Sequence, residues 1–530
     1  MNPETQALVD AALKRLAMPY DVTMPEWVQE YRPHQIEAID RILEAFRDGT
    51  RMVVLDAPTG SGKTLIGETV RQLVGGRGLY VCNNKTLQDQ FARDFPYARV
   101  VKGRSNYATW ETELSVTADD CNHTSSRQCS WCPSKRVCPY EIAKHEALDS
   151  DIAVLNTPYY MAETNGPGLF KARDLVIFDE ADTLEPAVMN FAGLQVSRRR
   201  VEQLGLGEPG KVTKEETWID WIDEAIPIVE RAIPVLNEDN ERIQEIVRDW
   251  NYLNRLSASL KDLRKAMLEG GWVYTGKDGA VSFKPVTVSD ISPQLLWPNG
   301  KRFLLMSATT ISAEAELEWH GWQAPYEVVT MGSTFDPKIR QVKVVSCADM
   351  SKKANERDEL AQGIRAILAR HPNERVLVHT VSYDLTLFVK DVLKKSGRKV
   401  YSYNQSLGRE TALDQFKRSK GGVLVAPSMD RGVDLPDDLC RVVVIAKVPF
   451  PYLGDRQVSA RLHARGGQTW YTVQTIRSIV QMTGRATRHK DDWSVSYILD
   501  SQFERNVWAK GRQLFPQWWV ESLDWRDRLV

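Results

Sequence analysis

The sequence predicts an α/β protein in which short buried strands alternate with helices around parallel sheets. This alternation runs through residues 1–110 and returns from Arg302 to the end of the chain, as parallel sheets require. A second observation is an apolar strand at 52–55, followed at once by a glycine-rich loop and a helical pattern. The third is the length of 530 residues, which suggests three or four domains.

Composition places the chain among globular proteins and excludes a membrane protein. Hydrophobic residues make up 42% and charged residues 26% of the sequence, and no apolar run approaches the roughly 18 residues of a membrane span. The start of the chain lacks the basic and apolar segments of a signal peptide, so we expect a cytoplasmic location. The net charge of −1 does not bear on nucleic-acid binding, which needs only a local basic groove.

The glycine-rich loop at 57–64 predicts a phosphate-binding site. Its glycines let backbone N–H groups surround phosphate oxygens, and the following helix directs its N-terminus at the anion. Lys63 supplies a charge to the β- and γ-phosphates, and the Thr64 hydroxyl can bind Mg²⁺. An ordinary turn is the alternative, but the strand–loop–helix setting favours ATP binding. The predicted contacts are Pro58, Thr59, Gly60, Ser61, Gly62, Lys63 and Thr64.

An acidic motif follows the apolar strand predicted at 175–178. Asp179 stands at the strand end, where it would hold Mg²⁺, and Glu180 would orient and deprotonate the attacking water. An acidic helix N-terminus would also favour carboxylates. Beside the phosphate loop, the catalytic interpretation is preferred because parallel sheets place their chemistry at the carboxyl ends of strands.

A third motif, Gln-x2-Gly-Arg-x2-Arg, lies late in the chain. Gln481 begins it, and Arg485 and Arg488 are three residues apart, on one face of a helix. Two such arginines can reach a γ-phosphate held by the other half of the chain and stabilise the charge of the transition state. A solvent-exposed basic face is the alternative for an isolated Arg-x2-Arg pair.

Two segments interrupt the strand–helix alternation. Residues 190–270 have helical periodicity, in which Pro227 and Pro234 are expected to kink or shorten a helix, and 272–286 predicts a β-hairpin. The other segment contains four of the seven cysteines, in the spacing C-x7-C-x2-C-x5-C. Four thiolates suit either a [4Fe–4S] cluster or zinc, and spacing alone does not choose between them. The predicted ligands are Cys121, Cys129, Cys132 and Cys138, whereas Cys82, Cys347 and Cys440 are expected to be buried thiols.

The order of motifs resembles that of superfamily 2 helicases, and specifically of the XPD/DinG group of iron–sulfur helicases. Besides the three motifs above, five segments are similar to that group. They are YRPHQ at 31–35, in which Gln35 would read adenine; NKTLQDQ at 84–90 (motif Ia); MSATT at 306–310 (motif III); MDRGVD at 429–434 (motif V), which includes Asp434; and VPFP at 448–451.

The resemblance implies two RecA-like domains with an Fe–S domain and a helical arch domain inserted into the first. The implied divisions are 1–110, 149–189 and 291–335 for the first RecA-like domain, 111–148 for the Fe–S domain, 190–290 for the arch and 336–530 for the second RecA-like domain. It also favours iron–sulfur over zinc. The family's first cluster cysteine corresponds to Thr109, so Cys121 is expected to take its place.

The implied activity is that of a monomeric, ATP-dependent DNA helicase that moves 5′→3′ along single-stranded DNA and unwinds forked or tailed duplexes. The expected strand contacts are Lys85, Thr86, Arg104, Asn106 and Tyr107, which combine charge, amide and aromatic groups. No base-reading motif is visible, so binding independent of base sequence is expected. An RNA or RNA–DNA hybrid helicase, and a nucleic-acid-binding protein with an inactive ATPase, are the alternatives.

Overall fold

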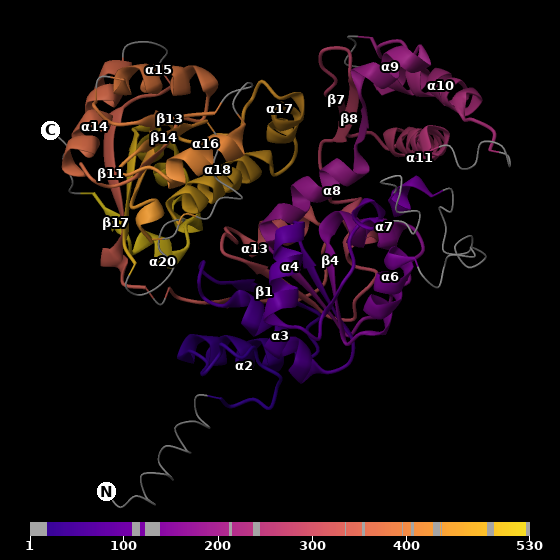
Figure 1. The fold of residues 1–530 in the computed structure, drawn as a ribbon, viewed down its shortest axis with the longest axis horizontal. Helices are drawn as coiled ribbons and strands as arrows, with labels where there is room; N and C mark the ends of the chain where they lie inside the picture. The colour runs from indigo at the N-terminus through magenta and orange to yellow at the C-terminus, as the bar shows by residue number, and fades with distance from the viewer. Residues whose placement is uncertain are drawn as a thin grey trace, which may run out of the picture.

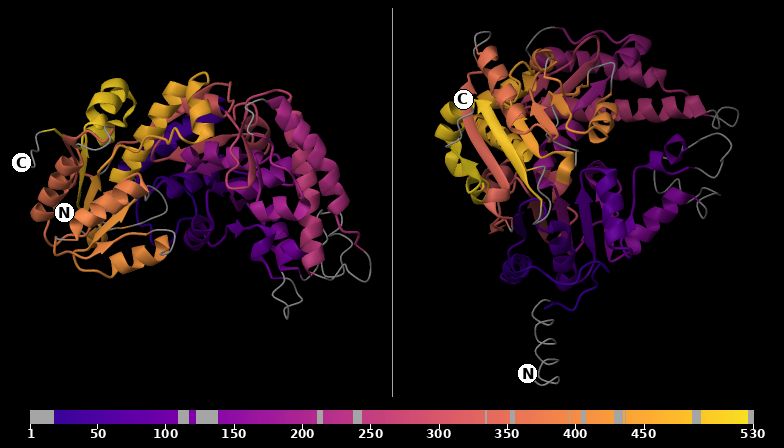
Figure 2. Two further views of the ribbon diagram at one scale, coloured as in Figure 1. Left: turned by 90° about the horizontal axis from the view of Figure 1, so that it is seen from above. Right: turned by 60° about the vertical axis from the view of Figure 1, so that its left-hand side comes forward.

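The computed structural model describes residues 18–108, 117–121, 138–210, 215–236, 244–333, 335–351, 356–394, 396–403, 408–427, 435, 437–484 and 492–525. They form two α/β lobes and a smaller unit that projects from the first lobe, drawn in magenta in Figure 1. The second lobe, in orange and yellow, lies beside the first, and Figure 2 shows the same arrangement from two further directions.

The first lobe is built on a parallel sheet of seven strands within the described residues, in the order β10-β1-β9-β5-β2-β4-β3. Strand β9 lies between β1, which leads into the glycine-rich loop, and β5, which leads into the acidic motif. The strands are β1 (Met52–Asp56), β2 (Gly78–Cys82), β3 (Arg99–Val100), β4 (Ile152–Asn156), β5 (Leu175–Asp179), β9 (Phe303–Ser307) and β10 (Tyr326–Thr330).

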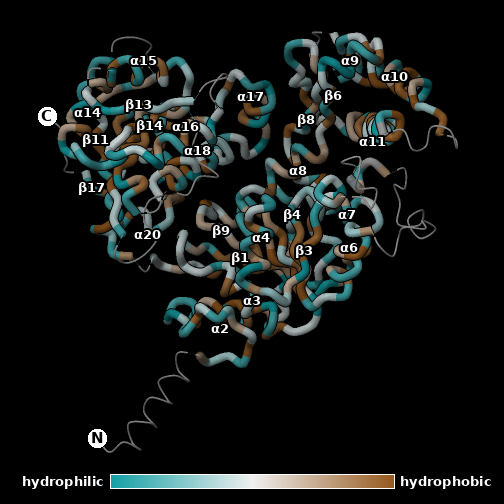
Figure 3. Tube along the Cα trace, in the orientation of Figure 1, coloured by the Kyte–Doolittle hydropathy of each residue, from teal (hydrophilic) through white to brown (hydrophobic). Residues whose placement is uncertain are grey.

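Helices cover both faces of the first sheet. Alternate residues of a strand point to opposite faces, so Val53 and Leu55 pack with α2, α3 and α4, whereas Met52 and Val54 pack with α7 and α8. Figure 3 shows the apolar strands enclosed by helices in this lobe. The helices are α2 (Pro33–Arg47), α3 (Lys63–Val74), α4 (Lys85–Asp94), α6 (Pro139–Asp149), α7 (Thr157–Asn165), α8 (Leu184–Ala192), α12 (Ser292–Leu296) and α13 (Ala313–Trp319).

The projecting unit joins three helices to a small antiparallel sheet, ordered β6-β8-β7. The predicted hairpin is confirmed, and β6 pairs with its second strand. Pro227 does not end α10, which continues through it and ends at Ala232, before Pro234. The apolar face of α10 supplies the stabilising contacts. The elements are β6 (Leu194–Val196), α9 (Arg198–Leu204), α10 (Glu215–Ala232), α11 (Gln244–Met267), β7 (Trp272–Tyr274) and β8 (Val281–Pro285).

The second lobe has a second parallel sheet of seven described strands, in the order β13-β14-β12-β15-β16-β11-β17. The strands are β11 (Arg340–Ala348), β12 (Val376–His379), β13 (Val400–Tyr401), β14 (Val423–Ala426), β15 (Val442–Ile445), β16 (Ser494–Asp500) and β17 (Leu523–Asp524). The α-helices are α14 (Arg357–Arg370), α15 (Tyr383–Leu393), α16 (Arg409–Lys417), α17 (Arg456–His463), α18 (Gly467–Thr483), α19 (Ala509–Gly511) and α20 (Gln517–Val520).

Two expectations about side chains are settled by burial. Cys82 and Cys440 are buried, as expected, but Cys347 on the irregular end of β11 is only partly buried, so that expectation was wrong. Among the described helices, none combines the length and apolar composition needed to span a membrane.

A candidate nucleotide site between the two lobes

The glycine-rich loop has the backbone conformation that its glycines predict. Gly60 and Gly62 adopt φ angles of 79° and 85°, in the left-handed region that favours glycine. A Cβ atom on Gly62 would lie 2.3 Å from Nε2 of Gln35, so a larger residue would displace that side chain. Gln35 holds this position by accepting a hydrogen bond from the Arg32 N–H (2.8 Å) and donating to the Ser61 carbonyl (2.9 Å). Gln35 thus helps to fix the conformation of the loop through its contact with Ser61.

Lys63 begins α3 and points back into the loop. Its ammonium group donates to the carbonyls of Ala57 (3.1 Å) and Pro58 (3.2 Å). Burial lowers the pKa of Lys63, while the carboxylates of Asp179 and Glu180 act in the opposite direction. The charge therefore lies between the loop and the acidic motif, where a phosphate group would need it.

The acidic motif is fixed by hydrogen bonds from neighbouring strands. Tyr80 Oη on β2 donates to Asp179 Oδ2 (2.6 Å), and the N–H of Glu180 donates to Asp179 Oδ1 (3.0 Å). Burial raises the pKa of Asp179. Glu180 has φ of 51°, a strained conformation for a residue with a side chain, and its carboxylate accepts a hydrogen bond from Asn83. Such strain is typical of functional sites.

The sheet brings the loop and the acidic motif to one edge. In β1, Asp56 lies opposite Ser307 of β9, and in β5, Asp179 lies opposite Met306 of the same strand. The N–H of Ala57 donates to the Ser307 carbonyl at 3.0 Å, which ties the loop to the carboxyl end of β9. All three strands are parallel, so their chemistry converges at this edge.

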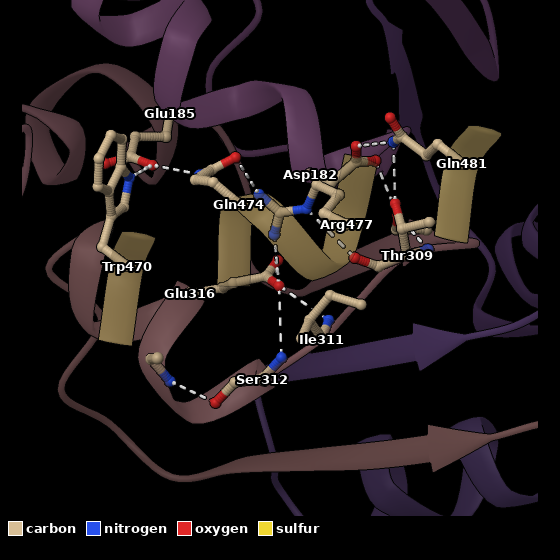
Figure 4. Close-up of polar contacts among 12 residues, drawn as sticks. Asp182, Glu185, Thr309, Ile311, Ser312, Glu316, Trp470, Gln474, Arg477 and Gln481 are labelled. Carbon is tan, nitrogen blue, oxygen red and sulfur yellow. Dashed lines mark hydrogen bonds and ion pairs between the residues drawn. The ribbon is translucent and has the colours of Figure 1, made fainter. Parts of the chain in front are cut away.

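The second lobe contacts this edge through α18. Gln481 Nε2 donates to Asp182 Oδ2 (2.9 Å) and to Thr309 Oγ1 (3.1 Å), as Figure 4 shows. Asp182 also accepts from Ser307 Oγ at 2.7 Å. The late motif, the acidic motif and the segment after β9 therefore form one hydrogen-bonded group that spans both lobes.

The end of α18 also approaches the phosphate loop. One cavity is lined by Pro58 and Thr59 of the loop together with Thr483 and Gly484 of the second lobe. Trp519 Nε1 donates to Thr483 Oγ1 at 2.7 Å and anchors the helix end in the second lobe's core. The next residue along the chain is Arg485. Of the two predicted arginines, the first thus directly follows a residue that shares a cavity with the phosphate loop.

Several predicted site residues lie outside the described residues: Thr109, Cys129, Cys132, Asp434, Arg485 and Arg488. Of the other two predicted cluster ligands, Cys138 precedes α6 and packs partly against the first lobe's core. The backbone carbonyl of Cys121 accepts a hydrogen bond from Asn251 Nδ2 of α11 (3.0 Å). Across the described part of the chain, no three His, Cys, Asp or Glu side chains group as metal ligands would.

The predicted strand contacts fall into two groups. Lys85 and Thr86 are exposed at the start of α4, after Asn84 caps the helix by accepting from the Leu87 N–H (3.0 Å). The other group lies at the turn Arg104–Asn106.

At this second group, all three side chains make contacts within the protein. Arg104 donates to the Ala118 carbonyl (2.9 Å) and lies over the ring of Tyr140. Tyr107 packs edge-on against Tyr140 with ring centroids 5.6 Å apart. Its hydroxyl accepts a hydrogen bond from the Lys102 N–H, and Asn106, although exposed, donates from Nδ2 to the Gly103 carbonyl at 2.8 Å.

Sequence reasoning missed the residues that hold the acidic motif, Tyr80 and Asn83. Tyr80 lies in β2, opposite Ile177 of β5, and Asn83 directly follows β2. The neighbour relation of β2 and β5 follows from strand order, which the sequence does not show. The available signal was a polar residue directly after a buried strand, since Asn83 follows Cys82.

Comparison with known proteins agrees with this geometry. Residues 364–522 match the family model described as a helicase C-terminal domain, and residues 29–185 match that of the type III restriction enzyme, res subunit. The ATP-dependent DNA helicase YoaA of Escherichia coli strain K12 is 22% identical over 579 residues, covering 87% of this chain and 90% of that protein. The YoaA protein of Haemophilus influenzae is 20% identical, covering 90% and 92%.

Solved structures show the same fold. The structure titled XPD_Helicase has a TM-score of 0.62 at 16% identity and covers 91% of this chain and 98% of its own. The structure of S. tokodaii Xpd4 has a TM-score of 0.57 at 18% identity, with 94% and 100% covered. The two parallel sheets give this chain the two-lobed fold of the XPD structures, and two matched family models lie one in each half of the chain. In sequence and fold, the chain is therefore similar to XPD/DinG-type superfamily 2 helicases.

Proposed function

We propose that this protein is an ATP-dependent DNA helicase that translocates 5′→3′ on single-stranded DNA. The observation that carries the proposal is the contact of Gln481 with Asp182 and Thr309, because it joins the late motif to the acidic motif across the two lobes. The names of the YoaA relatives support DNA as the substrate. Resemblance to the XPD/DinG group supports the polarity and the action on forked or tailed duplexes.

The site residues have distinct roles in ATP hydrolysis. Lys63 would bind the β- and γ-phosphates, and Glu180 would orient and deprotonate the attacking water. Thr64 and Asp179 would hold Mg²⁺, which neutralises phosphate charge when bound. Arg485 and Arg488 would stabilise charge that develops on the γ-phosphate.

Gln35 would contact adenine, and Asp434 would contribute from the second lobe. Because Gln35 now bonds the Ser61 carbonyl, contact with adenine would couple the base to the loop.

Translocation would follow from closure and reopening of the cleft between the lobes. Lys85 and Thr86 are exposed at a helix N-terminus, a setting that favours phosphate groups. We place the strand along this edge and past Asn106, with Arg104 and Tyr107 as further contacts. Such contacts bind the backbone and give little base preference.

An unwinding assay with tailed duplexes tests the proposal. With ATP and Mg²⁺, a duplex with a 5′ single-stranded DNA tail is expected to be unwound, and a 3′-tailed duplex is not. Matched RNA and RNA–DNA hybrid duplexes distinguish the alternatives. Unwinding of only the 3′-tailed DNA would refute the polarity, preference for RNA or hybrid would refute the substrate, and no ATP turnover with any strand would indicate a binding protein.

We also propose that Cys121, Cys129, Cys132 and Cys138 hold a [4Fe–4S] cluster. Four thiols within one short segment form a donor set that fits this cluster, with zinc as the alternative. Cys138 is held at the start of α6 and Cys121 by the contact of its carbonyl with Asn251. Both described ligands are thus attached to structured elements of the protein.

Anaerobic purification tests the cluster assignment. The protein is expected to be brown, with an absorption band near 400 nm and about four iron atoms per chain. Cys138→Ser is expected to remove the band, and Cys82→Ser, at a buried thiol inside β2, is the matched control that keeps it. Colourless wild-type protein with one zinc per chain would contradict the assignment.

We propose that the projecting unit is the arch domain and borders the path of the strand. Asn251 of α11 donates to the carbonyls of Cys121 (3.0 Å) and Asp119 (3.3 Å), so this unit touches the cysteine-containing segment. On its other side, Arg456 of α17 donates to the Tyr274 carbonyl at 3.3 Å. The unit therefore contacts both the cysteine-containing segment and the second lobe.

A further inference from the structure

A buried arginine lies on α18, four residues before Gln481. Arg477 is only 2% exposed, and its Nη2 lies 2.6 Å from Oε1 of Glu316 on α13. Its Nε donates to the Thr309 carbonyl at 3.3 Å, next to the hydroxyl that Gln481 binds. Figure 4 shows both residues of α18 pointing at the same segment of the first lobe.

Glu316 connects this arginine to the segment that follows β9. Its Oε1 accepts hydrogen bonds from the N–H groups of Ile311 (3.1 Å) and Ser312 (3.5 Å). Burial raises the pKa of Glu316, and the positive charge of Arg477 acts in the opposite direction. One carboxylate thus holds both the end of this segment and the second lobe's helix.

A second acidic side chain extends the network along α18. Glu185 of α8 accepts hydrogen bonds from Trp470 Nε1 (2.8 Å) and Gln474 Nε2 (3.2 Å). Gln474 Oε1 accepts in turn from Arg477 Nη1 at 3.2 Å. Trp470, Gln474, Arg477 and Gln481 are spaced four, three and four residues apart, so one face of the helix makes all of these contacts.

This arrangement fixes the helix more strictly than apolar packing would. Rotation or sliding of α18 by one residue would separate Arg477 from Glu316 and take from each buried charge its partner of opposite sign, which is strongly destabilising. Gln481 lies one turn further along the same face, and Gly484 lines the cavity beside the phosphate loop. The register of α18 therefore sets the positions of Gln481 and Gly484 beside the ATP site.

We propose that Arg477 is a positioning residue that, through Glu316 and the Thr309 carbonyl, sets the register of α18 against the ATP site. It acts on catalysis through Gln481 and the arginines that follow, without touching ATP itself. The proposal rests on the proposed function, because it assigns a part in the ATPase cycle to this contact. In this proposal, Glu316 is the residue of the first lobe that holds α18 in place through Arg477.

A double-mutant cycle tests the proposal. Arg477→Met, Glu316→Gln and the double variant are compared in steady-state ATP hydrolysis with saturating single-stranded DNA. Each single change is expected to lower kcat about tenfold, while the KM for ATP changes less than about threefold. The double variant is expected to be no slower than the slower single variant, because both changes break the same contact.

The matched control is Arg441→Met. Arg441 also pairs with a buried carboxylate, that of Asp492, but this pair lies within the second lobe. This variant is expected to keep kcat while lowering the thermal midpoint as much as Arg477→Met does.

Arg477→Lys replaces Arg477→Met in the cycle if that variant fails to fold. Lysine keeps the charge but carries it on a single nitrogen, so it cannot contact Glu316, Thr309 and Gln474 through separate nitrogens as arginine does. The lysine variant is expected to be intermediate in kcat.

Additive losses in the cycle, or a kcat unchanged while the thermal midpoint falls, would overturn the positioning role. Absence of ATP hydrolysis by the wild-type protein would instead refute the proposed function, so the two failures are distinguishable.

Discussion

Arg485→Ala is expected to slow ATP hydrolysis by the DNA-bound protein about 10³-fold or more, the lower end of what an arginine finger contributes. Arg485 directly follows Gly484, which shares a cavity with Pro58 and Thr59 of the phosphate loop. In the proposed site, this guanidinium group would stabilise charge that develops only in the transition state, so kcat is expected to fall while the KM for ATP changes little. Single-turnover hydrolysis at saturating single-stranded DNA measures the effect.

The matched control for Arg485 is Arg365→Ala, at an exposed position on α14 of the same lobe. It removes the same charge and is expected to leave the rate within about twofold of wild type, as surface changes away from a site commonly do. If Arg485→Ala also stays within about threefold of wild type, the arginine does not act on the phosphate.

Lys63→Ala is expected to lower ATP turnover by about 10²–10³-fold, the range for loss of one preorganised charge or donor at a reacting centre. The ammonium group lies between the loop carbonyls and the carboxylates of Asp179 and Glu180, so its removal takes away the positive charge that would meet the phosphates. ATP turnover in the presence of DNA measures the loss of rate, and equilibrium binding of a fluorescent ATP analogue measures the loss of the charge that meets the phosphates.

Lys301→Ala is the matched control for Lys63. Lys301 belongs to the same lobe but lies just before β9, at the opposite end of the strand from Ser307, and pairs with Asp174 at 2.8 Å. It is expected to turn over ATP at the wild-type rate. An equal loss in both variants would show that the effect comes from net charge or stability and not from the phosphate loop.

Strand positions could be predicted because buried parallel strands are short apolar runs between polar turns. The apolar runs at 52–55 and 175–178 both form strands, as predicted. Strand order could not be predicted, since it depends on contacts far apart in the sequence. The support of Asp179 by Tyr80 depends on that order and was missed for this reason.

The projecting unit shows the same division. Helical periodicity predicted the apolar face of α10, but not that the helix would continue through Pro227. The hairpin followed from the turn at Lys277–Gly279, whereas the pairing of Leu194–Val196 with Val281–Phe283 joins segments more than 80 residues apart. Local sequence patterns therefore predict helices and hairpins, whereas the pairing of strands far apart in the sequence depends on how the whole fold packs.

Within the site, the motifs predicted which residues meet but not how they are supported. Gln481 was expected at the ATP site, and the structure places it on Asp182. Its alignment depends on Arg477 and Glu316, which belong to no motif that the sequence marked. The available signal was that Arg477 is the one charged residue of α18, although the sequence alone does not show that it is buried.

A structure of the protein with single-stranded DNA, Mg²⁺ and an ADP–aluminium fluoride complex would measure the geometry of hydrolysis directly. We expect the fluoride group to contact Lys63 from the first lobe and the guanidinium groups of Arg485 and Arg488 from the second. Arginine side chains that face solvent, with the fluoride group bound by the first lobe alone, would contradict a shared catalytic site.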